Sequence, residues 1–426
     1  MKNLQRSTIL AGAVAVAAVV ALLTACTGSS RSADGDAIRV GAVYPLSGTQ
    51  GPGGLDEFHG VELAASMVNA LGGVDGRPIA LVPIDTPAGS VADDAISMLH
   101  RRGVRLVVGS YGSTISAPAS AAAARAGMLY WETGAVGQMA APDEGRLVFR
   151  VAPTGATLGS AAIDFVAREL APRLHRTPAS LRTVVINVND VYGNEVADGA
   201  LRAIRADGLH LVGRFPYDAY TLKPDVLARR IAALHPDVLF ASAYVEDGVA
   251  VRRALVREHV HLLAAIGSSS SYCMKAFGRA LGADAVGLFA SDKPDAGVLD
   301  PSGLTPGARA LLATANARYR ARYHTSMDAP ALAGFSAGWA LFRWTLPHAT
   351  AITPDAISAV ARGLHVPEGG LPNGSGIDFA PPGSPGAGSN LLAASVIWEW
   401  TGVDQRWVVW PQRYATWPIK VLPLAG

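Results

Sequence analysis

Short apolar runs alternate with amphipathic segments along the chain from residue 38 to residue 290. Apolar runs of this length, bounded by Gly, Pro or polar residues, are typical of buried strands, whereas apolar positions at helical spacing indicate helices. Val61, Ala64, Ala65 and Val68 show the helical spacing. The predicted strands cover residues 38–44, 78–85, 104–108, 128–131, 147–151, 183–188, 209–215, 238–242, 262–266 and 286–290.

The alternation occurs as two successive runs of similar length. The break falls near Pro153, where a polar Pro-Thr-Gly segment follows a strand. Because repeated strand–helix–strand units form parallel sheets covered by helices, we predict an α/β protein with two doubly wound parallel-sheet lobes. The helices predicted within these runs, after the one that contains Val61, cover residues 91–102, 157–174, 195–206, 224–234 and 247–259.

The last part of the chain has a different pattern. Helical spacing predicts helices over residues 307–323 and 330–348 and a shorter helix behind Thr353. A segment rich in Pro and Gly follows over residues 367–388. Finally, residues 396–400 and 407–410 are predicted strands joined by a turn that contains Gly.

A turn rich in Gly, Ser and Thr connects the strand over residues 104–108 to the next helix. In a βαβ unit this turn lies at the carboxyl edge of the sheet, where the unpaired N–H groups of the helix attract ligands. Ser110, Ser113 and Thr114 add hydroxyl groups there. The turn lacks the Gly-Lys-Ser/Thr ending and the spaced glycines of phosphate loops. Capping of the helix by Ser113 and Thr114 is the alternative to ligand binding.

Residues 1–25 have the layout of a signal peptide, since Lys2 and Arg6 precede an apolar run that ends in small residues. The ending Leu-Thr-Ala-Cys resembles a bacterial lipobox, so Cys26 is the predicted lipidation site and residues 26–37 a flexible tether. An ordinary cleaved signal and an uncleaved membrane anchor are the alternatives. All three place the mature domain outside the cytoplasm, and the lipid anchor would hold it at the extracytoplasmic face of the membrane.

Composition narrows the classes of function. Half of the residues are hydrophobic and 16% are charged, which excludes a disordered chain. Without Lys2 and Arg6 the basic residues number 34, equal to the 34 acidic ones, so nucleic acid is not an expected partner. Cys273 is the one cysteine besides Cys26, which rules out an intramolecular disulfide in the mature chain and leaves no Cys/His metal spacing. No cofactor is expected.

Five motifs together resemble the branched-chain amino-acid type of extracytoplasmic solute-binding protein of ABC transporters. The resemblance covers roughly residues 38–294 and is weaker beyond. The motifs are Ile-Arg-Val-Gly-Ala-Val-Tyr-Pro-Leu-Ser-Gly (38–48), Asn-Ala-Leu-Gly-Gly-Val-Asp-Gly-Arg (69–77), Val-Val-Gly-Ser-Tyr-Gly-Ser (107–113), Phe-Arg-Val-Ala-Pro (149–153) and Asp-Val-Tyr-Gly (190–193).

The resemblance implies the periplasmic-binding-protein type I fold, in which two lobes joined by a three-stranded hinge close on a ligand. We expect the chain to cross between lobes near Pro153, near Ser291 and around residues 364–378. The first lobe would then comprise residues 38–153 and 291–364. The second would comprise residues 154–290 and 365–426.

The resemblance also implies ligand contacts. In the family, a hydroxyl and backbone N–H groups in the turn matching Ser113 and Thr114 hold the carboxylate of an amino acid. Backbone from the segment matching residues 133–135 assists, and Tyr192 and Tyr244 match positions where the second lobe presents aromatic rings. The candidate ligand-binding residues are Ser110, Tyr111, Ser113, Thr114, Glu132, Thr133, Gly134, Ala135, Tyr192, Tyr244 and Ser269.

The sequence departs from the family at the site for the ligand's ammonium. Amino-acid members place an acidic residue in the stretch matching residues 267–270, which here reads Gly-Ser-Ser-Ser. Glu132 shares one strand parity with Met128 and Tyr130, so its carboxylate is a candidate to face the cleft and pair with an N–H-rich ligand group. A purely anionic ligand is then not expected. A solvated or arginine-paired carboxylate is the alternative.

An enzymatic reading centres on residues 334–338, which match the Gly-x-Ser-x-Gly pattern around a nucleophilic serine. That motif needs a strand entering the turn. Here Leu332, Phe335 and Trp339 lie at helical spacing, so we predict a helix and no enzymatic activity. A secreted hydrolase that uses Ser336 is the alternative.

These observations predict a lipid-anchored, monomeric binding component of an ABC importer. It would bind a small polar solute, amino-acid-like or amide-like, and present it to a membrane permease. A sensory ectodomain of the same fold that signals through a partner is the rival hypothesis.

Overall fold

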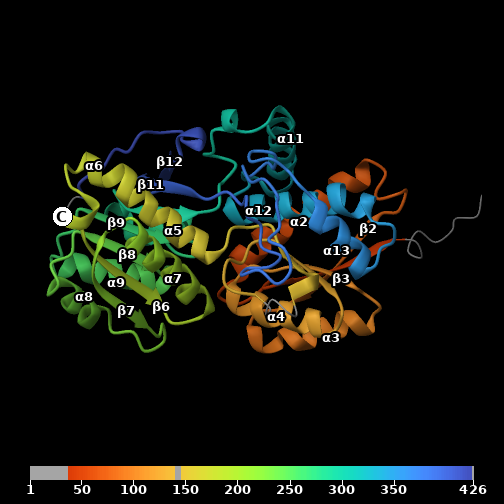
Figure 1. The fold of residues 1–426 in the computed structure, drawn as a ribbon, viewed down its shortest axis with the longest axis horizontal. Coiled ribbons are helices and arrows are strands. Elements are labelled where there is room, and N and C mark those ends of the chain that lie inside the picture. The colour runs from red at the N-terminus through yellow and green to blue at the C-terminus, as the bar shows by residue number, and fades with distance from the viewer. Residues whose placement is uncertain (1–36, 140–144, 425–426) are drawn as a thin grey trace, which may run out of the picture.

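The computed structural model describes residues 37–139 and 145–424. Two α/β lobes lie side by side along the long axis of the molecule, the amino-terminal one on the right in Figure 1. The predicted signal peptide, most of the tether and Cys26 lie outside the described residues, so lipidation remains a prediction. Within the described part of the chain, no helix is both long and apolar enough to span a bilayer.

The first lobe contains a sheet of five parallel strands in the order β2-β1-β3-β4-β5. Side chains of successive strand residues point to opposite faces of the sheet and so belong to two separate hydrophobic cores. Val40 and Ala42 belong to the core that includes residues of α2, whereas Val43 and Val107 join residues of α3 and α4. Both faces are thus covered, as parallel sheets require. The elements are β1 (Ile38–Tyr44), α2 (Gly51–Ala70), β2 (Ile79–Asp85), α3 (Ala92–Arg101), β3 (Leu106–Gly109), α4 (Ser113–Arg125), β4 (Leu129–Glu132) and β5 (Val148–Arg150).

The second lobe contains a sheet in the order β12-β11-β10-β9-β8-β6-β7. Its strands β6 to β10 are parallel, and the predicted hairpin of β11 and β12 adds two antiparallel strands at one edge. The strands are β6 (Arg182–Val188), β7 (His210–Tyr217), β8 (Val238–Ser242), β9 (Ala264–Ser268), β10 (Phe289–Asp292), β11 (Val396–Gly402) and β12 (Gln405–Trp410). The helices are α5 (Gly155–Phe165), α6 (Ala171–Arg173), α7 (Val191–Ala206), α8 (Pro224–Ala232), α9 (Val245–Arg257) and α10 (Lys275–Leu281). The α/β prediction is confirmed.

Three helices from the last part of the chain return to the first lobe: α11 (Pro306–Tyr323), α12 (Ala329–Trp339) and α13 (Pro354–Gly363). Helix α12 packs on α2 through glycines. A Cβ on Gly60 would overlap the carbonyl oxygen of Ala331, and one on Gly334 would overlap that of Glu57. The Gly-x-Ser-x-Gly segment is therefore part of a buried helix contact, and no strand enters it.

Several predicted helices differ in their ends because of proline and capping residues. The segment predicted as one helix over residues 157–174 is α5, a π-helical turn at Val166–Leu170, and α6. Pro172 lacks the backbone N–H that would continue the α-helical hydrogen-bond pattern. Helix α7 begins at Val191, earlier than predicted, because the side chain of Asp190 accepts from the N–H of Gly193.

The third passage between lobes lies later than expected. Phe379 packs against Trp131 and Phe149 of the first lobe, with ring centroids 5.5 Å and 5.1 Å away. The N–H of Asn390 still bonds to the carbonyl of Arg150. Residues 379–390 therefore contribute to the first lobe, whereas the carbonyl of Gly374 accepts from the hydroxyl of Tyr414, which follows β12. The chain enters the second sheet between Asn390 and β11 rather than within residues 364–378.

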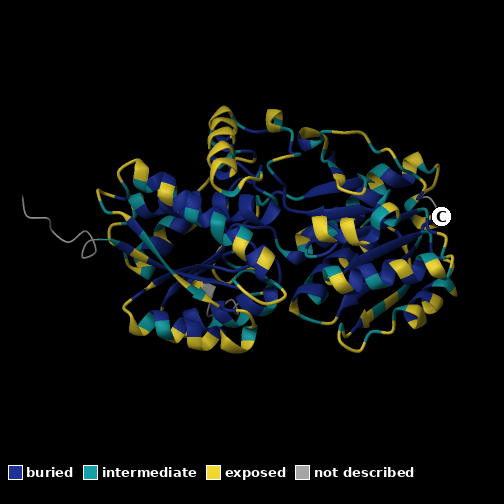
Figure 2. Cartoon of the chain, turned by 180° about the vertical axis from the view of Figure 1, so that it is seen from behind, coloured by how far each residue is buried: buried dark blue, intermediate teal, exposed yellow. Residues whose placement is uncertain are grey.

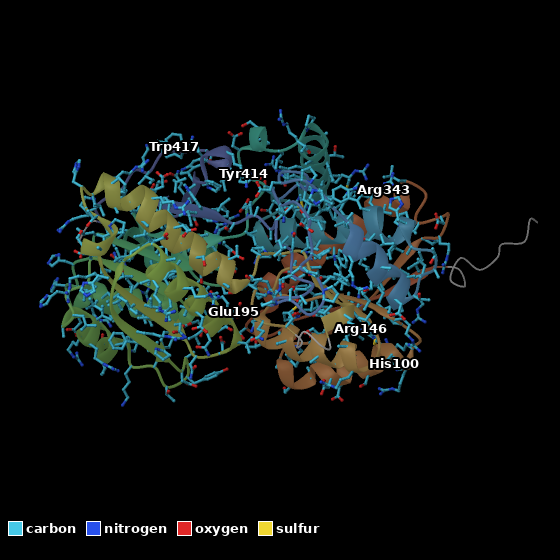
Figure 3. The ribbon with its side chains drawn as sticks, in the orientation of Figure 1. His100, Arg146, Glu195, Arg343, Tyr414 and Trp417 are labelled. Atoms are coloured by element: carbon cyan, nitrogen blue, oxygen red, sulfur yellow. The ribbon has the colours of Figure 1, made fainter. Side chains whose placement is uncertain are left out.

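The interior is apolar in both lobes. Figure 2 shows the central strands of both sheets in the buried colour, while many exposed residues occupy the outward faces of helices and the loops. The edge strands β2 and β7 are more exposed. Figure 3 places Glu195 of α7 at the boundary between the lobes. Its carboxylate acts on the buried guanidinium of Arg150 in β5, whose pKa burial lowers. The boundary is therefore built from polar and charged groups of both lobes.

Candidate functional site

The candidate site lies where the two lobes meet, at the carboxyl ends of β3, β4 and β9. A space with about 270 Å³ of empty volume, part of it open to solvent, lies there between residues of both lobes. The first lobe contributes the turn before α4 and the loop after β4, and the second lobe contributes the amino-terminal ends of α7 and α9. The lining residues are Tyr111, Gly112, Ser113, Gly134, Ala135, Val136, Tyr192, Tyr244, Ser269, Ser270 and Lys293.

The turn before α4 presents Ser113 to this space. Gly112 is the residue that precedes the helix, with φ of 88°, so neither Ser113 nor Thr114 is the cap and that alternative is wrong. The Ser113 hydroxyl oxygen accepts from the N–H of Gly137 at 2.9 Å. Thr114 accepts from the side-chain amide of Gln50 at 3.2 Å and is not among the lining residues. Of these two residues, Ser113 is thus the one whose hydroxyl is placed to contact a ligand in this space.

Glu132 lies behind the site rather than in it. Its carboxylate is fully buried and accepts from the N–H groups of Gly134 at 2.8 Å and Ala135 at 2.7 Å. It also accepts from the N–H of Ser110 at 3.2 Å and from the hydroxyl of Ser116. The carboxylate therefore joins the loop after β4 to the turn before α4.

The prediction that Glu132 faces the cleft is wrong. Its shared parity with Met128 and Tyr130 is correct, but those side chains belong to the core that contains α3 and α4. Helix α4, which carries Ser116, covers that face of β4. Burial raises the pKa of Glu132 to about 7, although the Ser116 hydroxyl and the Arg150 charge favour the carboxylate.

Two more candidates also support the loops instead of lining the space. The Thr133 hydroxyl donates to Glu57 Oε1 at 2.6 Å and lies 2.7 Å from the hydroxyl of Tyr44. The Ser110 hydroxyl donates to the carbonyl of Tyr111 at 3.1 Å. Burial, followed by the charge of Glu132, raises the pKa of Glu57 to about 8.

The second lobe presents two tyrosines with their rings 5.4 Å apart. The Tyr192 hydroxyl lies 2.9 Å from the hydroxyl of Ser268 and donates to the carbonyl of Ser269. Tyr244 precedes α9, and its hydroxyl donates to the carboxylate of Asp190 at 2.7 Å. Tyr111 faces them from the first lobe, with its hydroxyl 4.0 Å from the sulfur of Met274. The space is therefore bounded by three aromatic rings.

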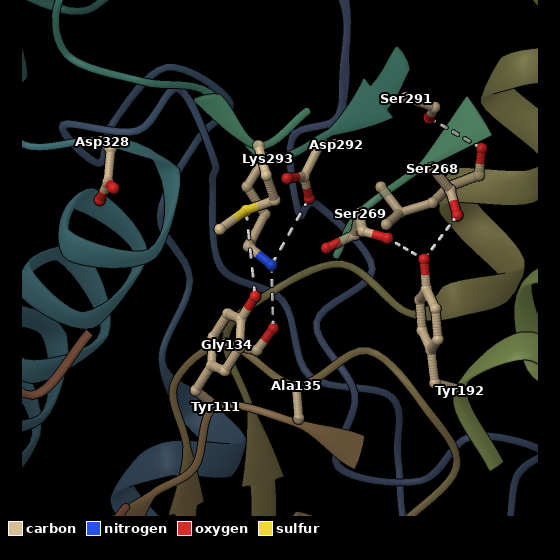
Figure 4. A network of polar contacts seen from close by, with 12 residues as sticks. Tyr111, Gly134, Ala135, Tyr192, Ser268, Ser269, Ser291, Asp292, Lys293 and Asp328 are labelled. Atoms are coloured by element: carbon tan, nitrogen blue, oxygen red, sulfur yellow. Dashed lines mark hydrogen bonds and ion pairs between the residues drawn. The ribbon is translucent and has the colours of Figure 1, made fainter. Parts of the chain in front are cut away.

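Lys293 is the lining residue that the sequence did not reveal. It follows β10 directly, is 2% exposed, and its ammonium donates to the carbonyl of Gly134 at 3.1 Å, as Figure 4 shows. Asp292 Oδ1 lies 3.5 Å from the same nitrogen. Burial alone would lower the pKa of Lys293, but the carboxyls of Asp292 and Glu57 outweigh it and raise that pKa. Lys293 is therefore a cation at neutral pH.

The position of Lys293 had one signal in the sequence. A lysine directly after the strand at a predicted lobe crossing is a charged group at the lobe boundary. Gly112, Val136 and Ser270 were also missed, but each neighbours a residue that was predicted, and the loops that carry them are the predicted ones.

Comparison with known proteins agrees with this architecture. A family model described as periplasmic binding protein matches residues 37–389. The Leu/Ile/Val-binding protein homolog 8 of Brucella abortus is 26% identical over 344 residues, which cover 80% of this chain and 84% of that protein.

Two solved structures show the same fold. The branched-chain amino acid transporter substrate binding protein LivJ of Streptococcus pneumoniae, in complex with isoleucine, has a TM-score of 0.70 at 17% identity and covers 88% of this chain and 100% of its own. An ABC transporter solute binding protein of R. palustris, in complex with benzoate, has a TM-score of 0.66 at 17% identity. The match covers 88% of this chain and 95% of that protein.

Proposed function

The chain belongs to the periplasmic binding protein family of ABC-transporter substrate-binding proteins, and from this we propose that it captures a small polar solute between its two lobes and delivers it to a membrane permease. The observation that carries the proposal is the space at the lobe boundary, which is lined from both lobes. A ligand there contacts both lobes at once and favours their closed arrangement.

The contacts between the lobes support this mechanism. The contact of Tyr111 with Met274 joins the first lobe to the second, and separation of the lobes would break it. The bond from Lys293 to Gly134 ties the segment that crosses between the lobes to the first-lobe loop. Because a polar ligand loses water on closure, the hydroxyls, N–H groups and ammonium of the lining must replace those hydrogen bonds.

We propose that the solute is of amino-acid size and bears an acidic group. The relatives are consistent with this class, since one is described as a Leu/Ile/Val-binding protein homolog and two neighbours hold isoleucine and benzoate. The protein would carry out no chemistry on its solute.

Small-angle scattering tests the closure. A panel of amino acids, amides, amines and small carboxylates is first screened by thermal shift, where a ligand at a hundredfold excess over its Kd stabilises by about 2.7 kcal/mol. The best ligand should then reduce the radius of gyration. A stabilising ligand that leaves the radius unchanged contradicts the hinge mechanism.

The lipid anchor is a separate proposal that rests on Leu23-Thr24-Ala25-Cys26. Intact mass of membrane-extracted protein should correspond to a diacylglyceryl-modified chain that begins at Cys26. A Cys26→Ala variant should appear in the soluble fraction, and equal membrane retention of this variant would exclude lipidation as the anchor.

A further inference from the structure

We propose that the solute is a small monocarboxylate without a charged amine, and that the ammonium of Lys293 recognises its carboxylate. This inference deepens the proposed function and rests on it. It reverses the expectation from the sequence, which excluded a purely anionic ligand because Glu132 was placed in the cleft.

The charge of the residues that line the space favours an anionic ligand. Of the described residues that line the space, Lys293 is the one with a charged side chain, and the others offer hydroxyls, backbone groups or apolar surface. An ammonium has three N–H donors. One is directed at the carbonyl of Gly134 and a second lies within ion-pair distance of Asp292, so a third remains for a ligand.

The first lobe adds donors opposite Lys293. Ser113 uses its oxygen to accept from Gly137, so its O–H is available to donate to a ligand. Ser113 also opens α4, a helix of 13 residues whose first N–H groups have no acceptor within the helix. A carboxylate accepts several such bonds at once, and buried donors stabilise its charge.

The described residues that line the space include no carboxylate for an α-ammonium. Three nearby carboxylates are already engaged: Glu132 with backbone N–H groups, Asp190 with Tyr244 and Gly193, and Asp292 with Lys293. Glu57 lies against Gly134 but is fully buried outside the lining, where its Oε1 accepts from Thr133. Two carbonyls of the lining loops, those of Gly134 and Ser269, already accept bonds. A second ammonium would therefore lie near Lys293 without a counter-charge, and like charges in a buried site repel.

The remaining surface suits an apolar group. Tyr111, Tyr192 and Tyr244 bound the space with their rings, and Val136 and Ala135 add aliphatic surface. A short branched or aromatic substituent buries its area there without needing further hydrogen bonds. The chemical class is thus a small aliphatic or aromatic acid.

Matched ligands test the inference on the wild-type protein. 4-Methylpentanoate and leucine differ only in the α-ammonium, phenylacetate and phenylalanine form a second pair, and 4-methylpentanamide removes the negative charge. Calorimetry should show each acid binding at least tenfold more tightly than its amino acid, and more tightly than the amide. The inference is overturned if leucine or phenylalanine binds as tightly as its matched acid, or if neither acid binds at millimolar concentration.

A variant pair assigns the effect to Lys293. Lys293→Met keeps the length of the side chain and removes the charge, and it should weaken the binding of the acids tenfold to a hundredfold more than the binding of the amide. Lys223→Met, at an exposed lysine, is the control and should change nothing. Unchanged affinity of Lys293→Met for the acids excludes the inference. If that variant does not fold, the ligand pairs decide alone.

The two proposals fail in different ways. Compaction on binding leucine, with no preference for the acid, keeps the proposed function and removes the inference. Binding of the acid without compaction keeps the ligand class and removes the closing mechanism.

Discussion

Replacement of Glu57 by glutamine should flatten the pH dependence of stability. Glu57 is fully buried in α2, and among the described residues its Oε2 atom has no hydrogen-bond partner. Burial and the neighbouring Glu132 raise its pKa from 4.5 to about 8. The folded protein therefore keeps this proton at a pH where the unfolded chain has lost it.

The sign of the effect follows from proton linkage. Between pH 4.5 and pH 8 the folded state binds more protons than the unfolded state, so stability is greatest below pH 4.5 and falls as the pH rises through 8. One pKa unit corresponds to 1.36 kcal/mol, which gives a loss of at most about 5 kcal/mol over this window. Glutamine is neutral throughout and does not contribute this loss. Its carbonyl still accepts from Thr133, so the fold is retained.

The assay is urea unfolding at pH 5, 7 and 8.5, monitored by tryptophan fluorescence, since Trp131 is buried in the same lobe. Wild type should lose several kcal/mol between pH 5 and pH 8.5, and Glu57→Gln should lose distinctly less. Glu246→Gln, at an exposed carboxylate, is the matched control and should follow wild type. Parallel curves for wild type and Glu57→Gln would refute the reasoning.

Three other variants test structural roles. Gly60→Ala should lower the free energy of unfolding by about 1–3 kcal/mol, because the new Cβ would overlap the α12 backbone. Gly307→Ala is the control, since open space surrounds that position, and it should keep the wild-type melting temperature. Equal effects of the two variants would contradict the packing argument. Ser336→Ala should leave binding and stability unchanged, since its buried hydroxyl has no partner within the described residues; a loss of binding in calorimetry would argue otherwise. Glu132→Gln should weaken binding by about 1–3 kcal/mol through its loop hydrogen bonds, and an unchanged affinity would show that these bonds do not support the binding loop.

The individual strands and the two lobes follow from local patterns, and for that reason they could be predicted. The apolar run at residues 238–242 coincides with β8, and the predicted hairpin at the carboxyl end is β11 and β12. A buried parallel strand needs apolar residues on both faces, so its signal is contained within a few residues. The third lobe passage was misplaced because residues 365–390 form a long loop without periodicity, and only contacts such as Phe379 with Trp131 show which lobe it belongs to.

The site could be predicted at the level of loops but not of side chains. Tyr111, Ser113, Tyr192, Tyr244 and Ser269 line the space as expected for residues at the carboxyl edges of parallel strands. Strand parity placed Glu132 on one face of β4, but parity does not reveal whether a helix or a cleft covers that face. Here α4 covers it, through the hydroxyl of Ser116.

The positions of Glu132 and Lys293 together explain how the site can hold an anion in a buried place. The Glu132 carboxylate binds the N–H groups of Gly134 and Ala135 from behind and so fixes the loop whose carbonyl, at Gly134, accepts from Lys293. Lys293 directly follows β10 at the predicted crossing between the lobes, so its bond to Gly134 ties that crossing to the loop after β4. A carboxylate ligand would add a counter-charge to the ammonium at that same junction. Recognition of charge would then depend on one residue, which is why the Lys293→Met variant should lower affinity for acids far more than affinity for the neutral amide.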